Sequence, residues 1–218
     1  MQLATLQTAS KRDQIAELLR EAILGGEILP GERIVESRIA KQLGVSQAPI
    51  REALALLERQ GLVVKVHNRG AFVSRLHGRE LRELFTLRSV LDGFSARLAA
   101  ERATHADIAV LRAILERMRE AETAGDVAKL TEAHLQFHEA IYRLSGHELL
   151  AEIFAQIHPR MALALTFAEN LFQAEGHETD CHVPLVDALA ARDADAAERI
   201  AKELATGWID QVEIDRES

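Results

Sequence analysis

The stretch "GVSQAPIREALALLERQGLV", Gly44 to Val63, joins two halves of different character. Most of its first seven residues are small or polar, and they include Pro49, whereas the remainder has the apolar spacing of an amphipathic helix. Ser46 is a typical N-cap residue, and proline is tolerated in a first helical turn because the missing N–H costs little there. The pattern predicts a helix with little side-chain bulk at its start and Arg51 one turn further on, as expected where another molecule approaches closely.

The residues on both sides of this stretch predict three helices followed by a hairpin. Residues 11–24 carry apolar side chains at helical spacing, and residues 35–44 read as a second, short helix that Gly44 ends. The β-rich runs at 62–66 and 70–76 surround "HNRG", which is a hairpin signal. A helix, a tight turn and a second helix form a helix-turn-helix, although an ordinary pair of amphipathic helices gives a similar pattern.

In a helix-turn-helix the start of the second helix enters the major groove of DNA. Ser46 and Ala48 are small enough to let the backbone approach DNA, and free N–H groups there can meet phosphate. The amide of Gln47 offers a donor and an acceptor to a base edge, and Arg51 can reach guanine or phosphate. These four residues are therefore candidate DNA contacts.

Residues Leu29 to Val73, "LPGERIVESRIAKQLGVSQAPIREALALLERQGLVVKVHNRGAFV", closely resemble the winged-helix head of GntR-family transcription regulators. The resemblance implies that Ser46 and Arg51 contact DNA. It also implies that Arg69 and Gly70 lie in a wing tip that enters the minor groove.

One position departs from the family pattern. Gln47 stands where the family commonly has an arginine that reads guanine, and glutamine pairs more naturally with adenine. Arg38 and Lys41, on the preceding helix, face either phosphate or only solvent. The operator core that is common in the family is therefore not expected for this chain.

Charge divides the 218-residue chain into two expected domains, residues 1–76 and 77–218. The first carries 11 Lys and Arg against 8 Asp and Glu, and the second carries 15 against 26, so a mildly basic head precedes an acidic body. The single cysteine, Cys181, permits no internal disulfide and favours a reducing compartment. Without an 18-residue apolar run or a signal-peptide core, we expect a cytoplasmic protein with no membrane partner.

The body reads as helix throughout, and the whole chain is expected to be mainly α. Asp107, Asp126 and Asp193 look like N-caps. The pattern predicts an all-α bundle of six to seven helices, with helices at 78–102, 107–123, 126–145, 148–167, 178–191 and 194–212.

Two histidines of the body lie on one helical face. His134 and His138 are four residues apart in "LTEAHLQFHEAIYRLSG", beside the apolar side of that helix. Paired imidazoles at this spacing can bind a divalent transition metal if other ligands converge on them. The alternative is two partly buried histidines that neighbouring groups satisfy.

The body is similar to the all-helical FCD ligand domain of the FadR-like branch of the same family. The similarity rests on "ELFTLRSVLDGFSARLAAERAT" at 83–104, "FHEAIYRLSG" at 137–146 and "HVPLVDALAARDADAAERIAKEL" at 182–204. It implies a metal bound by His134, His138 and His182, and imidazole ligands suit Zn²⁺ or Ni²⁺. The fourth family position falls on Leu204, which cannot bind a metal, so its neighbour Glu203 is the alternative fourth ligand.

Arg88 matches an arginine that faces the ligand cavity in the family. A guanidinium there would hold a carboxylate effector through two parallel hydrogen bonds, with the three histidines beside it. The alternative is a surface ion pair of Arg88 with Glu83 or Asp92.

Three functions are compatible with this sequence pattern. The first is a homodimeric transcription regulator, a repressor by family habit, whose binding to double-stranded operator DNA responds to a small carboxylate. The second is a metal-dependent helical hydrolase with an accessory DNA-binding head, and the third is an architectural DNA binder. Glu139 points away from the apolar side, no P-loop or nucleophile elbow appears, and an architectural protein has no use for the large body, so we favour the regulator.

Overall fold

The computed structural model describes residues 10–76, 78–172 and 179–214. The chain forms two compact units, Met1–Arg75 and Leu76–Ser218, which are described separately below. Within the described residues, no helix is both long and apolar enough to span a membrane.

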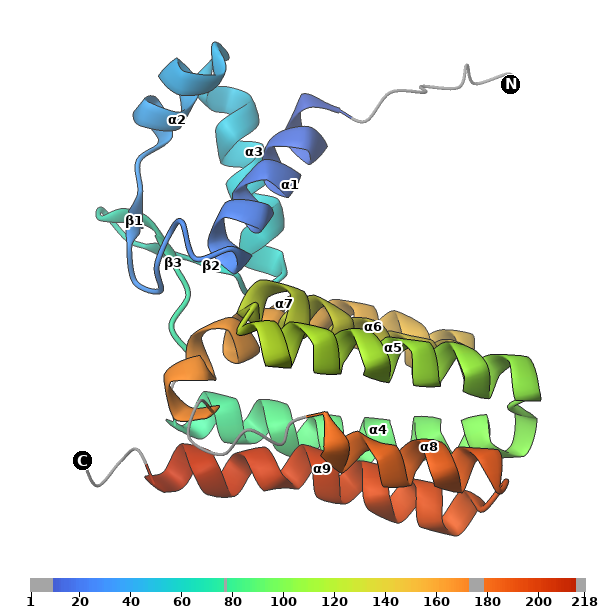
Figure 1. Cartoon of the computed structure of the whole chain (residues 1–218). Coiled ribbons are helices and arrows are strands. Elements are labelled where there is room, and N and C mark those ends of the chain that lie inside the picture. The colour runs from blue at the N-terminus through green and yellow to red at the C-terminus, as the bar shows by residue number, and fades with distance from the viewer. Residues whose placement is uncertain (1–9, 77, 173–178, 215–218) are drawn as a thin grey trace, which may run out of the picture. The chain divides into compact units, whose positions relative to one another are not determined.

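The N-terminal unit is a three-helix core with a small sheet (Figure 1). Its apolar core combines one face of each of the first and third helices with residues in and next to the sheet. Fully buried members of this core are Ile23, Ile50, Leu57 and Leu62. The elements are α1 Lys11–Leu24, β1 Arg33–Ile34, α2 Glu36–Leu43, α3 Gln47–Arg59, β2 Val63–Val66 and β3 Gly70–Val73.

The sheet is antiparallel with the strand order β1-β3-β2. The expected β2–β3 hairpin is confirmed, and Phe72 of β3 pairs with Val64 on one side and Arg33 on the other. β1 is not predicted from the sequence, because two residues are too few to display the alternation that identifies a strand. The three strands and three helices together make a winged helix-turn-helix.

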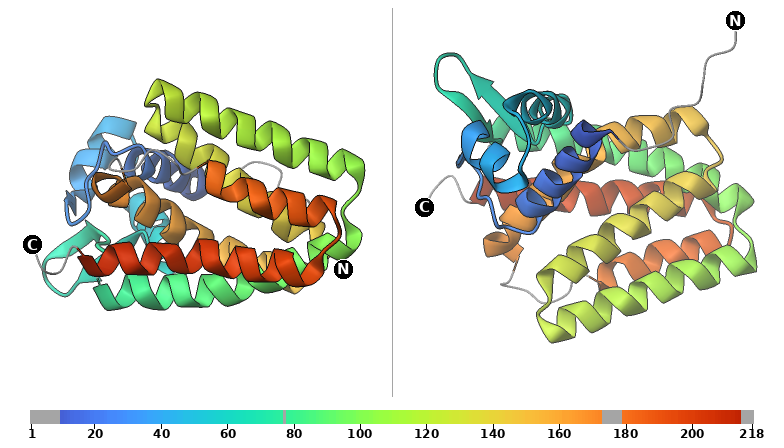
Figure 2. Two further views of the ribbon diagram at one scale, coloured as in Figure 1. Left: turned by 60° about the horizontal axis from the view of Figure 1, so that its bottom comes forward. Right: turned by 90° about the horizontal axis from the view of Figure 1, so that it is seen from above.

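The C-terminal unit is all-α, as the sequence predicts (Figure 2). The expectation of six to seven helices is met by six α-helices and one short 3₁₀ helix in the described residues. They are α4 Gly78–Arg102, α5 His105–Ala124, α6 Val127–Leu144, α7 Glu148–Phe172, η1 Asp180–His182, α8 Val183–Ala190 and α9 Ala194–Ile214.

Two helix starts differ from the prediction. Thr104, not Asp107, is the N-cap of α5, and Asp107 completes a capping box by accepting from the Thr104 backbone N–H at 2.9 Å. The expected helix at 178–191 is a 3₁₀ turn followed by α8, with Pro184 in the first turn of α8. Asp126 and Asp193 do accept from backbone N–H groups at the starts of α6 and α9.

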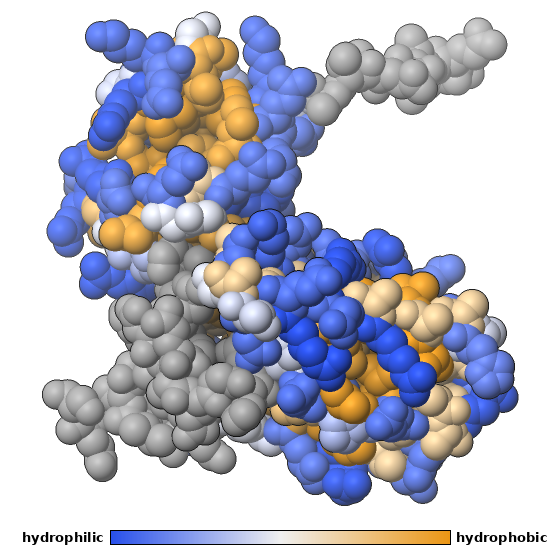
Figure 3. Space-filling view, viewed as in Figure 1, coloured by the Kyte–Doolittle hydropathy of each residue, from blue (hydrophilic) through white to orange (hydrophobic). Residues whose placement is uncertain are grey.

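Helices α4 and α9 lie side by side along their length (Figures 1 and 2). Gly93 permits this close approach, since a Cβ there would lie 2.7 Å from side-chain carbons of Lys202. Fully buried Ala96, Ala100 and Ala197 continue the contact with small side chains. The opposite side of α4 takes no part in this contact and is exposed. The face of this unit that Figure 3 shows is largely hydrophilic, with apolar areas between charged ones.

Candidate functional site

The start of α3 is open to solvent. Gly44 ends α2 in the left-handed conformation, with φ 65°, and this conformation turns the chain into α3. Ser46 is the N-cap, as expected, but its side chain makes no capping hydrogen bond. Gln47 and Ala48 are exposed, whereas Ile50 is fully buried and anchors the helix. The N-terminal end of α3 thus offers N–H groups and short polar side chains to a ligand.

Arg51 is held across the turn between α2 and α3. Its Nε donates to Oε2 of Glu36 at 2.7 Å, and its Nη2 donates to Oε1 of Gln47 at 3.1 Å. The Arg51 side chain remains 64% exposed, so these contacts orient the guanidinium without burying it. Arg38 is also exposed on α2, and it too is one of the predicted DNA contacts.

The wing carries the other predicted DNA contacts. Arg69 and Gly70 are exposed at the β2–β3 turn, where Asn68 has φ 56° and Gly70 has φ 100°. Glycine adopts such a conformation without steric cost, and asparagine tolerates it. The Arg69 guanidinium lies 5.9 Å from the centre of the Phe72 ring.

Three predicted metal ligands converge inside the C-terminal unit. His134 and His138 face inward from α6, and His182 comes from η1, more than forty residues along the chain. One ligand atom from each lies within 4.8 Å of the others, and the Nε2 atoms of His134 and His138 are 3.0 Å apart. All three side chains are buried. Such a cluster can hold a transition metal or bind a polar ligand through hydrogen bonds.

A buried charged network from α4 adjoins the histidines. Arg88 donates from Nε to Oδ2 of Asp92 at 2.8 Å, and its Nη2 lies 2.5 Å from Nε2 of His138. Tyr142 donates to Oδ1 of Asp92 at 2.7 Å, and Oδ2 of Asp92 faces Nδ1 of His138 at 3.6 Å. The alternative of an ion pair between Arg88 and Asp92 is correct in its partners, but its surface location is wrong, because the two side chains are each 3% exposed.

Burial sets the protonation of this cluster. It lowers the pKa of His134 and His138 well below the usual value, and the neighbouring His182 and Arg88 lower these pKa values further. Burial also raises the pKa of Asp92, although Arg88 and the Tyr142 hydroxyl oppose this shift. The two imidazoles are therefore neutral at neutral pH, and neutral imidazole is the form that binds metals.

Two buried polar atoms near the cluster have no hydrogen-bond partner within the described residues. They are Nη1 of Arg88 and Oγ1 of Thr179, which lies one residue before η1. An unsatisfied buried N–H group destabilises a protein by roughly 1–3 kcal/mol, and by more when it is charged. Such an atom therefore marks a place where a ligand can supply the missing acceptor.

The structure does not bring every candidate ligand to the cluster. Glu203 is exposed on α9 and forms an ion pair with Arg199 at 3.1 Å. Leu204 packs against the apolar core. Cys181 is exposed, with its sulfur 3.3 Å from Nδ1 of His182.

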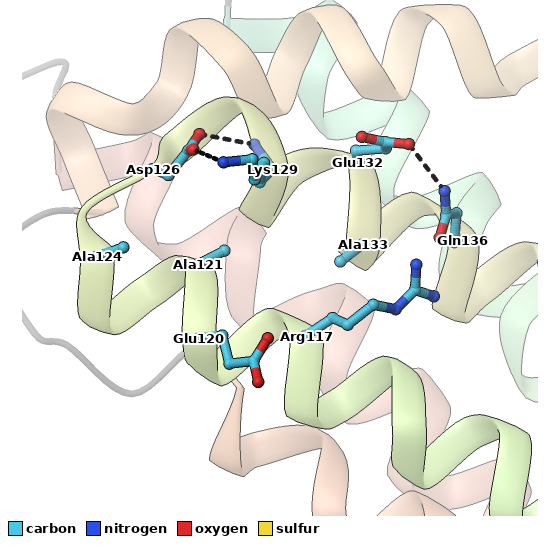
Figure 4. Close-up of a pocket in the computed structure, with 9 residues that line it drawn as sticks. All are labelled: Arg117, Glu120, Ala121, Ala124, Asp126, Lys129, Glu132, Ala133 and Gln136. Atoms are coloured by element: carbon cyan, nitrogen blue, oxygen red, sulfur yellow. Dashed lines mark hydrogen bonds and ion pairs between the residues drawn. The ribbon is translucent and has the colours of Figure 1, made fainter.

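A separate open pocket lies between α5 and α6 (Figure 4). Its volume is about 380 Å³, and none of its nine lining residues belongs to the histidine cluster. Lys129 and Asp126 form an ion pair at 2.7 Å, and Gln136 donates to Glu132 at 3.0 Å, so much of its polar lining is satisfied internally.

Three residues of these sites were assigned no role from the sequence alone. Glu36 positions Arg51, and nothing in the local pattern indicates a contact between residues fifteen apart. Tyr142 donates to Asp92, and it continues the four-residue spacing of His134 and His138, which was an available signal. Thr179 gave no signal.

Two family models match the chain. Residues 11–73 match "Bacterial regulatory proteins, gntR family", and residues 83–206 match "FCD domain". The solved structure of Escherichia coli McbR/YncC superposes with a TM-score of 0.79 at 26% identity, covering 96% of this chain and 100% of that one.

Two curated relatives are transcription regulators by name. The Nta operon transcriptional regulator of Aminobacter aminovorans is 40% identical over 137 residues, which cover 62% of this chain and 64% of that protein, less than two thirds of its length. The "Probable D-xylose utilization operon transcriptional repressor" of Paenarthrobacter nicotinovorans is 30% identical over 185 residues, covering 85% of this chain and 81% of that protein.

Proposed function

Since this chain belongs to the gntR family of bacterial regulatory proteins and carries an FCD domain, we propose that residues 1–76 bind operator DNA and residues 77–218 bind an effector and dimerise. Members of this family are transcription regulators and not enzymes, and this removes the hydrolase alternative.

The proposed DNA surface is the α2–turn–α3 end with the wing. The exposed start of α3 inserts Gln47 and Arg51 into the major groove, with Ser46 and Ala48 close to the backbone of the DNA. Arg38 neutralises phosphate from α2. A second surface, the wing tip at Arg69 and Gly70, enters the minor groove, where negative potential attracts arginine.

The proposed effector is a small carboxylate. The observation that carries this proposal is the buried Arg88, whose Nη1 has no partner in the described part of the chain. A carboxylate supplies the missing acceptor and accepts two parallel hydrogen bonds from one guanidinium. His134, His138 and His182 lie beside it and fix the position of the ligand.

We further propose that the three histidines hold a divalent metal, Zn²⁺ or Ni²⁺. Their ligand atoms are close enough to share one ion, and burial keeps the two α6 imidazoles neutral. The donor set therefore fits the metal that FCD domains often contain. Such an ion would supply a positive charge for one carboxylate oxygen, while Arg88 binds the other.

The proposed assembly is a homodimer. One head covers a short half-site, and two linked heads gain avidity on a near-palindrome. Leu87, Val90 and Phe94 form an apolar stripe on α4, with 47%, 60% and 43% of each side chain exposed, and a second copy could cover it. Repression is proposed from the name of the Paenarthrobacter relative.

Metal analysis followed by a thermal-shift screen tests the effector proposal. Purified protein should contain Zn²⁺ or Ni²⁺, and at least one of a panel of mono- and dicarboxylates should raise its Tm. His138→Ala should lower metal content and abolish the Tm response, whereas His105→Ala, at the exposed start of α5, should preserve both. An unchanged Tm response in His138→Ala would place the effector elsewhere.

Sedimentation velocity tests the assembly separately. The wild-type protein should sediment as a dimer, and Val90→Asp should shift it toward the monomer because the charge would be buried in the interface. Val110→Asp, on a similarly exposed valine of α5, is the matched control. A dimer that survives Val90→Asp unchanged would exclude the α4 stripe as the interface.

A further inference from the structure

The contact between Arg88 and His138 fixes which nitrogen of the imidazole carries the proton. Arginine has five N–H donors and no acceptor. Nη2 of Arg88 lies 2.5 Å from Nε2 of His138, so this nitrogen accepts through its lone pair. The proton of the neutral ring is then on Nδ1, the atom that faces the Asp92 carboxylate at 3.6 Å.

The same lone pair is the one that a metal would use. Nε2 of His138 faces Nε2 of His134 at 3.0 Å, and these atoms point into the histidine cluster. A nitrogen offers one lone pair in the ring plane, so it cannot accept from a guanidinium and bind a metal at once. A positive guanidinium at 2.5 Å also repels a divalent cation that arrives at the same atom.

We propose that Arg88 blocks His138 in the metal-free protein, and that metal binding displaces this guanidinium and converts it into a two-donor site for a carboxylate. This inference rests on the proposed metal and carboxylate functions and adds their order and coupling. The displaced Nη2 and the already unpaired Nη1 form the end of the guanidinium that can donate two parallel hydrogen bonds.

Asp92 allows the guanidinium to move without losing its charge partner. It binds Nε of Arg88, which takes no part in the edge of the guanidinium that Nη1 and Nη2 form, and the Tyr142 hydroxyl fixes its other oxygen. Nε can therefore stay bound while the other two nitrogens change partners. Asp92 and Tyr142 are positioning residues in this scheme, because they act through Arg88.

Coupling of the two ligands follows from this competition. If metal binding frees the donors that a carboxylate needs, then a carboxylate that captures those donors must raise the affinity for metal by the same factor. Without Arg88, the metal should bind more tightly, and the carboxylate should affect it much less, because only the metal itself then attracts the carboxylate. These two effects have opposite directions, so a loss of folded protein cannot imitate them.

A competition titration tests the proposal. Metal-free protein is titrated with Zn²⁺ against a chromophoric chelator, with and without succinate, which serves as the carboxylate probe. Arg88→Gln should bind Zn²⁺ about 10-fold more tightly than the wild type and should lose most of the effect of succinate. Arg97→Gln, which removes an equal charge from an exposed ion pair on α4, should match the wild type.

A second variant controls for the destabilising effect of an unpaired buried charge. Arg88→Gln alone leaves Asp92 buried without its cation, so Arg88→Gln/Asp92→Asn removes both charges together. Circular dichroism and effector-free DNA binding verify that each variant is folded. The double variant should show the same tight Zn²⁺ binding, with little effect of succinate.

The outcomes separate this inference from the proposed function. Tighter Zn²⁺ binding in both Arg88 variants, or binding that appears only in them, supports the block. Equal or weaker binding than in the wild type overturns the block and leaves the metal site standing. If neither wild type nor variants bind Zn²⁺, the metal site and the block both fail, and a Tm response of the wild type to succinate would then leave Arg88 as the only cation for the carboxylate.

Discussion

Nε of Arg51 donates a hydrogen bond to Oε2 of Glu36 at 2.7 Å, across the turn that joins α2 and α3. The acceptor is on the helix that precedes the turn, and the donor is one turn into the helix that we propose reads DNA. Glu36 therefore holds the guanidinium at the exposed start of α3 before DNA arrives. An arginine oriented in advance loses less side-chain freedom on binding.

Arg51→Ala should abolish specific DNA binding and leave the fold intact, because it removes an exposed, charged contact. The expected loss is at least about 1–3 kcal/mol per half-site. Fluorescence anisotropy on operator DNA selected by the wild type measures it, with Arg59→Ala, at the far end of α3, as the control. Equal affinity of Arg51→Ala and wild type would show that α3 is not the recognition helix.

Glu36→Gln should weaken discrimination more than it weakens binding. A neutral amide holds Arg51 less firmly, and the loss of one negative charge favours any DNA through its phosphates. We expect the ratio of specific to non-specific affinity to fall by about tenfold, which equals roughly 1.4 kcal/mol. Glu52→Gln is the charge-matched control on α3, and the positioning role would be refuted if both variants lowered the ratio equally.

Gln47→Arg should move the selected sequence toward guanine at one symmetric position in each half-site. The reason is that a glutamine amide suits adenine, whereas a guanidinium suits the O6 and N7 acceptors of guanine. Selection from random DNA with both proteins measures this preference. Identical selected motifs would mean that Gln47 reads no base.

Acid should destabilise the metal-free protein through its buried histidines. Burial holds the pKa of His134 and His138 in the folded state well below the ordinary histidine value of 6.5, so the unfolded chain binds protons first as the pH falls. The free energy of unfolding therefore has its full value above pH 6.5 and decreases below it, by up to about 1.4 kcal/mol per pH unit for each histidine.

Urea unfolding at pH 7.5, 6.5 and 5.5 measures this dependence. Below pH 6.5, His138→Gln should reduce the slope of the free energy of unfolding against pH by the contribution of one histidine. His105→Gln, at the exposed start of α5, should keep the wild-type slope. A slope that His138→Gln does not change would mean that His138 is not held neutral in the folded protein.

The sequence alone predicted the elements that a periodic pattern of apolar residues identifies. Periodic apolar residues located every α-helix, and glycines and capping residues located most of their ends. β1 was missed because it has two residues, and the α5 cap was misplaced because Thr104 and Asp107 both suit that role and only their mutual hydrogen bonds distinguish them.

The candidate site was predictable where its residues share one helix. The spacing of His134 and His138 indicated a common face, and the resemblance to a known domain added His182. The burial of the Arg88–Asp92 pair could not be predicted, because four-residue spacing permits an exposed pair equally well. The contact of Arg88 with His138 depends on how α4 packs against α6, which no local pattern encodes.

The central claim is that ligands at the buried histidines control DNA binding by α3. The most direct test measures the operator affinity of wild type and His138→Ala, with and without Zn²⁺ and the carboxylate that raises Tm most. We predict that the ligands weaken DNA binding by the wild type about 5- to 150-fold and leave His138→Ala, which binds DNA normally without them, unaffected. An operator affinity that the ligands leave unchanged in the wild type, or weaken equally in both proteins, would contradict the account.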